Sequence, residues 1–220
     1  MARISKNKPV KKAIYVFWEG ESEEAYSKFL KEEFEEYAII KCHREKGTFL
    51  TAKSYYRNNR RFKSDVEELD EIWLFFDTEI EMGDQWDEKM KCLKDIIKSR
   101  PRNNPLKIRL LMTTGCIEYW LLLHFKKTAP SIATSADKEK ILNEVRKIEP
   151  TYIKGDYTSI ENIAKHYLAA VENGQWTLER LKDDGLPEDE QQRNQWLFRG
   201  EHTFTTVHEA LLMLMELSKE

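Results

Sequence analysis

The amino-acid sequence predicts an α/β fold in which a parallel sheet of about four strands is flanked by helices. Four short hydrophobic runs, which predict strands, lie at residues 13–18, 37–42, 71–77 and 107–114. The first shows no alternation, as is typical of a strand buried on both faces. Segments with apolar residues at helical spacing separate these runs, and strands that alternate with helices form parallel sheets. The sequence therefore predicts an α/β core over residues 1–127. A mostly helical C-terminal extension, packed on that core, is expected over residues 128–220.

The segments between the first three runs are predicted to be helices. After the first run, Tyr26, Phe29 and Leu30 recur at helical spacing, and Ser22 can serve as the N-cap. After the second run, the sequence GTFLTAKSYYRNNRRF predicts one helix from about Thr48 onward.

Helical periodicity continues through the rest of the chain. Between the third and fourth runs, apolar residues repeat at i, i+4, i+7 and i+11, at Trp86, Met90, Leu93 and Ile97. The sequence PRNNP at 101–105 predicts a turn, and IEYWLLLHF at 117–125 predicts a buried helix. In the extension, an acidic surface loop is expected at 183–192. Helices are expected from Ser135, near 158–172 and 176–183, and over 206–217.

The composition fits a folded protein without disulfides or structural zinc. Hydrophobic residues make up 40% of the 220 residues and aromatic residues 11%, which is enough for a core. The three cysteines are far apart in the sequence and form no CxxC pair. No apolar run reaches the roughly 18 residues of a membrane span, so we expect a cytoplasmic protein without membrane contact. Because the net charge is −3, binding to nucleic acid would depend on local basic patches.

Acidic residues follow three of the four predicted strands. Glu19 follows the first strand, Asp77 and Glu79 come at the end of the third, and Glu118 follows the fourth. The carboxyl ends of parallel strands meet at one edge of a sheet, where four carboxylates destabilise each other unless a proton or a cation neutralises them. Carboxylate ligands without a well-placed cysteine or histidine favour Mg²⁺ or Mn²⁺. The alternative is that each acid is a solvated residue of a loop or of a helix start.

Four stretches of the chain resemble the motifs of one protein family. The stretches are EGESEEAY, WLFFDTE, TTGCIEYWLLLHF and TFTTVHEALLML. They resemble the EGxxTExxYF, FDxD, SNPxFExWLLLHF and STxVHxL motifs of the RloB-like proteins, a branch of the Toprim superfamily. Glu19 and Glu23 match the acids of the first motif, with one residue fewer in the spacing. Glu79 stands where the family has a second aspartate, and TGC replaces the turn that precedes Glu118.

The resemblance implies a Toprim-like sheet, a prokaryotic origin and a role in defence against phage or foreign DNA, often beside a partner ATPase. By matching position, it makes Glu19 the general acid/base or a ligand, and Asp77 and Glu79 metal ligands. It also makes Glu118 and His124 candidate catalytic residues, with Glu118 a further candidate ligand. The apolar run before His124 alone indicates a buried, hydrogen-bonded histidine instead.

A basic face is predicted on the helix that follows the second strand. Cations recur there at i, i+4, i+7 and i+8, at Lys53, Arg57, Arg60 and Arg61. Such a face could follow the phosphates of a nucleic acid. The alternative is a face that only meets water.

Two functions of different classes agree with these features. The first is a Mg²⁺- or Mn²⁺-dependent Toprim-type nuclease that cleaves DNA or RNA in antiviral defence. The second is a non-catalytic Toprim-like module that senses or holds a partner such as an ATPase, which the glutamate at position 79 favours. Nucleotidyl transfer is a third option, weakened because no template-binding extension is evident. The expected partners are nucleic acid, an ATPase and a second copy of the chain.

Overall fold

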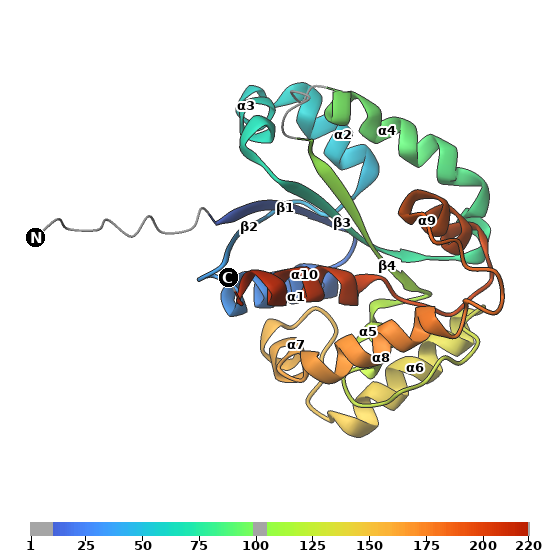
Figure 1. The fold of residues 1–220 in the computed structure, drawn as a ribbon. Coiled ribbons are helices and arrows are strands. Elements are labelled where there is room, and N and C mark those ends of the chain that lie inside the picture. Colours follow the sequence, from blue (N-terminus) through green and yellow to red (C-terminus); the bar gives the residue numbers. More distant parts are fainter. Residues whose placement is uncertain (1–10, 99–104, 220) are drawn as a thin grey trace, which may run out of the picture.

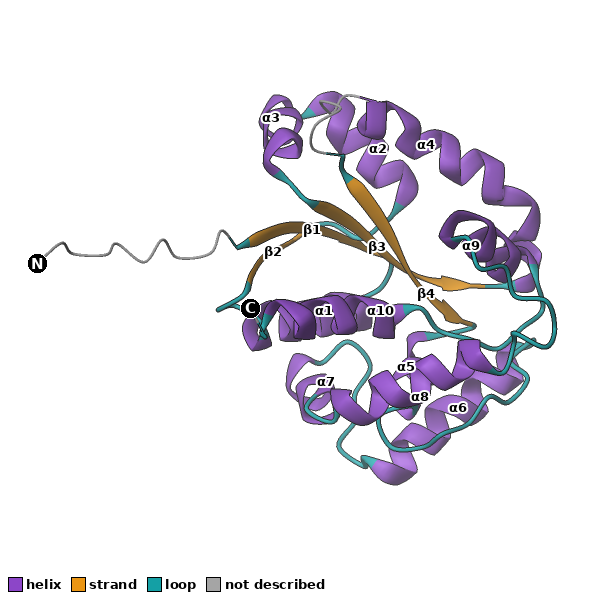
Figure 2. Ribbon diagram, viewed as in Figure 1, coloured by secondary structure: helices purple, strands orange, loops and turns teal. Residues whose placement is uncertain are grey.

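A computed structural model describes residues 11–98 and 105–219 of the chain, and it confirms the predicted fold class. The four strands are β1 (Lys12–Trp18), β2 (Ala38–Cys42), β3 (Glu71–Thr78) and β4 (Lys107–Thr114). They form one sheet in the order β2-β1-β3-β4, and every neighbouring pair is parallel. The sheet is twisted and lies between two layers of helices (Figures 1 and 2).

Helices connect and cover the strands. The first half of the chain contains α1 (Glu21–Glu33), α2 (Phe49–Asn58), α3 (Arg60–Glu68), the 3₁₀ helix η1 (Ile80–Gln85), α4 (Trp86–Lys98) and α5 (Ile117–Leu122). The second half contains α6 (Ser135–Ile148), α7 (Tyr157–Ala164), α8 (Tyr167–Glu179), α9 (Glu190–Arg199) and α10 (Val207–Leu217). None of the helices in the described part of the chain is long and apolar enough to cross a membrane.

Two hydrophobic clusters, one on each face of the sheet, make up the core. Ile14 and Val16 of β1 point into one cluster, and Tyr15 and Phe17 point into the other. The first cluster also contains buried residues of α1, α5, α6, α7, α8 and α10, and the second those of α2, α3, α4 and α9. Figure 1 shows this division, with α4 and α9 above the sheet and α1 and α10 below it. Because both of their faces are covered, the central strands β1 and β3 are nearly continuous apolar runs, whereas the edge strand β2 alternates buried and exposed residues.

The C-terminal helices take part in both layers. On one face α10 packs against α8 and β4, and on the other α9 packs against α4 and η1. The segment before α10 also lies along the outer edge of β4. There Thr205 pairs with Thr113, and the Thr206 hydroxyl accepts a hydrogen bond of 2.8 Å from the N–H of Met112. These bonds pair part of the outer edge of β4, whose backbone groups would otherwise lack partners.

Three helix predictions are wrong in their details. The helix expected from Thr48 is two helices, because the side chain of Asn59 accepts a bond from the N–H of Phe62 and starts α3. The helices expected near 158–172 and 176–183 are replaced by α7 and α8. The predicted cap Ser22 lies inside α1, where its hydroxyl accepts a bond of 3.0 Å from the N–H of Gly155.

Three further segments differ from the prediction or fall partly outside the described residues. The acidic segment at 183–192 ends in the start of α9, where the Asp189 side chain accepts a bond from the N–H of Gln192. The buried helix predicted over 117–125 is shorter, because α5 ends at Leu122 and a turn follows. The turn predicted at 101–105 lies outside the described residues, except for Pro105.

Candidate functional site

The ends of the two central strands bring two predicted acids together. The N–H of Glu19 donates to the carbonyl of Phe75 at 3.0 Å, so Glu19 continues the pairing of β1 with β3. In return the N–H of Asp77 donates to Oε2 of Glu19 at 3.3 Å. The parallel register therefore holds the Glu19 carboxylate beside the backbone of Asp77, as the sequence predicted for this edge of the sheet.

The first turn of α1 adds a third acid, Glu23. Its side chain is buried, with 3% exposed, and its Oε2 lies where a side chain on Gly20 would be. A Cβ placed on Gly20 would be 2.8 Å from that oxygen. The Gly20 backbone is extended, with φ −134°, so the glycine provides space and not an unusual backbone angle. The spacing of Glu19, Gly20 and Glu23 thus lets one carboxylate fold back over the strand end.

The start of α5 supplies a fourth acid, Glu118, which is 2% exposed. Gly115 turns the chain from β4 towards α5 with φ 78°, a conformation that favours glycine. Oε1 of Glu118 accepts a hydrogen bond from the hydroxyl of Tyr152 at 3.1 Å and lies 3.2 Å from Nζ of Lys154. Glu118 is therefore already bonded to a loop that follows α6.

Burial raises the pKa values of three of these acids, and neighbouring carboxylates add to the effect. Burial is the largest cause for each of them. It raises the pKa of Glu23 to about 7 and that of Glu19 above its ordinary value. The pKa of Asp77 is raised well above its ordinary range, because the charges of Glu23, Glu19 and Glu118 add to the effect of burial. We call Glu19, Glu23, Asp77 and Glu118 the carboxylate cluster.

The cluster has the donor chemistry of a site for a hard divalent cation. Oxygen ligands from carboxylates suit Mg²⁺ and Mn²⁺. In addition, Oδ1 of Asp77 is buried without a hydrogen-bond partner, which is costly for a charged oxygen unless a cation or a proton meets it. As the side chains stand, no three acidic, histidine or cysteine groups in the described residues converge closely enough to hold a metal ion. Loading a cation would therefore require carboxylate side chains to rotate towards Oδ1.

A family model for RloB-like protein matches residues 14–214, which is most of the chain and includes the whole carboxylate cluster. The chain belongs to the RloB-like family. No curated protein and no solved structure matches it significantly. The carboxylate cluster of this family member must therefore be interpreted from its own contacts.

Two residues that the RloB-like motifs pointed to lie outside the cluster. Glu79 follows β3, but its carboxylate forms a close ion pair with Lys138 of α6. His124 is buried in the core, with Nε2 3.1 Å from the hydroxyl of Tyr26 and Nδ1 3.0 Å from the carbonyl of Trp120. Burial lowers the pKa of His124 to about 3, so it is neutral near pH 7. Both ring nitrogens thus face core groups, as the apolar run before His124 indicated.

The predicted basic face is divided between two helices. Lys53 and Arg57 lie on α2, whereas Arg60 and Arg61 lie on α3 beyond the break at Asn59, so the prediction of one helical face is wrong. The arginines are exposed and Lys53 is half-buried.

Three other lysines, which sequence reasoning missed, are placed close to the cluster. Lys89 of α4 and Lys138 of α6 act electrostatically on Glu19, and Lys154 pairs with Glu118. Because they come from three distant segments, no local motif reveals them. Tyr152 was missed for the same reason. Glu23, which the match to the first motif made a weaker site candidate than Glu19, joins the site.

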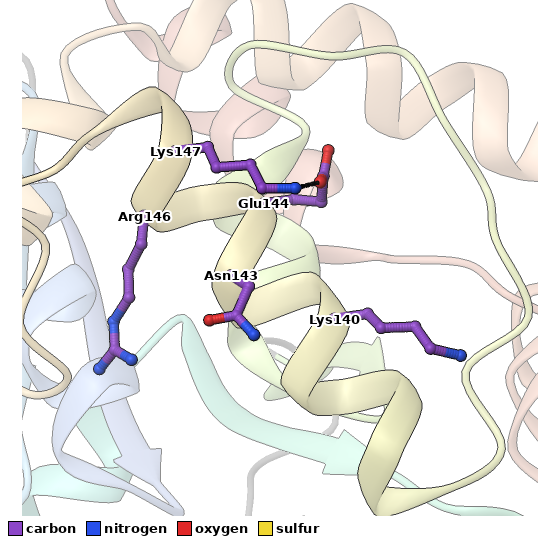
Figure 3. Close-up of a pocket in the computed structure, with 5 residues that line it drawn as sticks. All are labelled: Lys140, Asn143, Glu144, Arg146 and Lys147. Carbon is purple, nitrogen blue, oxygen red and sulfur yellow. Dashed lines mark hydrogen bonds and ion pairs between the residues drawn. The ribbon is translucent and has the colours of Figure 1, made fainter.

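A shallow hollow on the outer face of α6 is separate from the cluster. It is lined by Lys140, Asn143, Glu144, Arg146 and Lys147. Figure 3 shows that these side chains all project from one helix and that Lys147 turns to Glu144, where an ion pair of 2.6 Å joins them. The hollow holds no member of the carboxylate cluster, and we interpret it as a solvated helix face.

Proposed function

We propose that this RloB-like protein is a Mg²⁺- or Mn²⁺-dependent nuclease that cleaves phosphodiester bonds of DNA or RNA, with Toprim-type chemistry, in defence against phage or foreign DNA. One observation carries the proposal. The carboxylate cluster gathers four acids at the carboxyl edge of a parallel sheet, where open α/β sheets bind their ligands, and leaves the buried Oδ1 of Asp77 without a partner. A buried carboxylate oxygen without a donor reduces stability, which favours a role for Asp77 beyond folding.

In this proposal Asp77 and Glu19 hold the cation, and Glu23 adds negative charge beside them. A bound divalent ion would polarise a phosphate oxygen and lower the pKa of a water molecule. Burial raises the pKa of Glu19, which makes its carboxylate better able to accept a proton than an exposed glutamate is. The bond from the Asp77 N–H to Oε2 holds the Glu19 carboxylate in place for that transfer.

The second candidate function is a non-catalytic module that holds or senses a partner such as an ATPase. Two observations favour it. Glu79, which stands for an aspartate of the family motif, is engaged by Lys138. The acids of the described residues also need to move before three of them can meet one ion. The defence role rests on the family resemblance, and plating of phage on cells with and without the protein tests it.

Cleavage assays separate the two functions. The purified protein is incubated with plasmid, single-stranded DNA and tRNA in Mg²⁺, Mn²⁺ or EDTA. We expect metal-dependent cleavage of at least one substrate. Asp77→Asn and Glu19→Gln should each reduce the rate at least about 100-fold, which corresponds to about 2.7 kcal/mol of transition-state stabilisation.

The matched control is Glu24→Gln, in the first turn of α1. Glu24 only forms an i,i+4 ion pair with Lys28 at the surface, so its variant should cut as the wild type does. The nuclease proposal fails if no substrate is cut in either metal, or if Asp77→Asn remains fully active.

A further inference from the structure

Lys154 has an unusual position for a surface lysine. Its side chain is 63% exposed, yet its ammonium lies 3.2 Å from a carboxylate oxygen of Glu118, which is 2% exposed. A lysine on a protein surface usually turns its ammonium to water and lays its stem on the protein. Here the ammonium reaches inward while the side chain stays accessible. Lys154 therefore stands at the boundary between solvent and the carboxylate cluster.

The charge of Lys154 acts on other members of the cluster besides Glu118, its ion-pair partner. It also favours the ionised forms of Glu23 and Asp77. By contrast, Lys138 is engaged by Glu79. Among these lysines, Lys154 is the one whose ion pair is with a member of the cluster.

The loop that carries Lys154 is held firmly on both sides. The N–H of Gly155 donates to Ser22 of α1 at 3.0 Å, and the Asp156 side chain accepts a bond of 2.8 Å from the N–H of Ser159 in α7. Gly155 has φ 78°, and a Cβ there would be 2.8 Å from Oε2 of Glu21. A larger residue at this position would push the loop away from α1. The backbone around Lys154 is thus fixed before any ligand arrives, as expected of a binding site.

Glu118 and Tyr152 fix the side chain of Lys154 in turn. Oε1 of Glu118 receives both the Tyr152 hydroxyl and the Lys154 ammonium. This oxygen is therefore occupied by two donors and is poorly placed to be a metal ligand. The contacts favour a positioning role for Glu118, in place of the catalytic role that the sequence suggested.

We propose that Lys154 binds a phosphodiester oxygen of the substrate at the mouth of the carboxylate cluster, and that Glu118 and Tyr152 position it there. The inference rests on the proposed nuclease function, because it assigns the substrate contact of the same site. A polyanion that approaches four carboxylates needs a positive group next to them, and a lysine ammonium is a compact charge that suits phosphate. Lys154 supplies that charge at the point where solvent meets the cluster.

The test compares Lys154→Met and Lys154→Arg with Lys147→Met, a control lysine on α6 that pairs with Glu144. The anisotropy of labelled single-stranded DNA and RNA oligonucleotides is measured in Ca²⁺ and in EDTA at several salt concentrations. We expect Lys154→Met to weaken binding roughly tenfold and to reduce the slope of log K against log salt by about 0.7, as loss of one phosphate contact on a single strand does. Lys154→Arg should recover most of the binding, and the control should match the wild type.

Two further measurements identify the role of Lys154. On the substrate that the wild type cuts, Lys154→Met and Tyr152→Phe should raise KM more than they lower kcat. The affinity for Mn²⁺, followed by electron paramagnetic resonance, should remain the same or rise in Lys154→Met, because a competing cation is removed.

The outcomes separate this inference from the nuclease proposal. If the wild type cuts nothing but Lys154→Met loses oligonucleotide binding, the nuclease proposal fails and the phosphate contact stands. If the wild type cuts and Lys154→Met binds and cuts equally well, the assignment of Lys154 is overturned. It is also overturned if the wild type binds neither oligonucleotide, or if Lys154→Met loses Mn²⁺ binding together with substrate binding.

Discussion

Replacing Glu23 with glutamine should stabilise the metal-free protein at pH 8 and have little effect near pH 4. Glu23 is 3% exposed, and burial raises its pKa from 4.5 to about 7, with the charges of Glu19 and Glu118 adding to the effect. The folded protein therefore binds this proton more tightly than the unfolded chain does. Its contribution to stability is complete below about pH 4.5 and falls as the pH rises to about 7.

The expected size of this effect follows from the pKa of Glu23. A tenfold change in proton affinity corresponds to about 1.36 kcal/mol, so a rise from 4.5 to about 7 corresponds to roughly 3 kcal/mol at pH 8. Glutamine has the same shape and no charge, so Glu23→Gln avoids this loss. For a protein of this size, about 1 kcal/mol shifts Tm by roughly 2–4 °C. The variant should therefore melt up to roughly 6–12 °C above the wild type at pH 8.

Thermal melts followed by circular dichroism between pH 4.5 and pH 8 in EDTA measure the difference between variant and wild type. Added Mg²⁺ should stabilise the wild type more than Glu23→Gln, because a cation favours the ionised carboxylate. Glu24→Gln, with its surface ion pair, should stay within about 0.5 kcal/mol of the wild type at each pH. A Glu23→Gln variant whose stability follows that of the wild type in parallel from pH 5 to pH 8 would refute the reasoning.

Two other variants test the buried ion pair of Glu71 and the space beside Gly20. Glu71 is 1% exposed, and although burial alone would raise its pKa, the hydrogen bonds and charge of Arg109 lower it to about 2. Its stabilisation is present above about pH 4.5 and is lost as the pH falls towards 2. Glu71→Gln should lower the free energy of unfolding, measured in urea at pH 7, by about 3–5 kcal/mol, because it leaves the buried charge of Arg109 without its partner. An unchanged midpoint of unfolding would contradict this. Gly20→Ala should displace the Glu23 carboxylate and reduce cleavage at least about tenfold, whereas Gly83→Ala, with no contact under 3.6 Å, should not. Equal activity of the two glycine variants would show that Glu23 does not need its present position.

The sequence was enough to predict the sheet and the place where its acids meet. Continuous apolar runs identified all four strands, and the predicted bounds of β4 match those observed. Parallel topology then placed Glu19, Asp77 and Glu118 at one edge, since the carboxyl ends of parallel strands coincide. Glu23 was harder to assign, because an acid in the first turn of a helix is usually solvated. Its match to the first family motif was the available signal, and the space that its carboxylate occupies explains the glycine at position 20.

Other features depend on contacts between distant segments, which periodicity does not report. Tyr152 and Lys154 lie in a loop after α6 and reach Glu118 through the packing of α6 on α5 and of α7 on α1. The break at Asn59 depends on one side chain that caps the next helix, although RNNRR itself permits a continuous helix. The start of α9 lies in the acidic segment that was predicted to be a surface loop, because Asp189 is the N-cap of this helix.

Two buried glutamates of this chain show why the cluster points to function. Glu71 and Glu23 are almost equally buried, yet the pKa of one is lowered and that of the other is raised. Glu71 receives donors from Lys12, Trp73 and Arg109. For Glu23 the largest favourable contribution comes only from its own backbone N–H. The fold can therefore supply partners to a buried carboxylate, and it does so at the start of β3. At the other end of the same strand it leaves Oδ1 of Asp77 without one. The two ends of β3 thus treat a buried carboxylate differently, and in the proposed function a cation would supply the partner that Asp77 lacks.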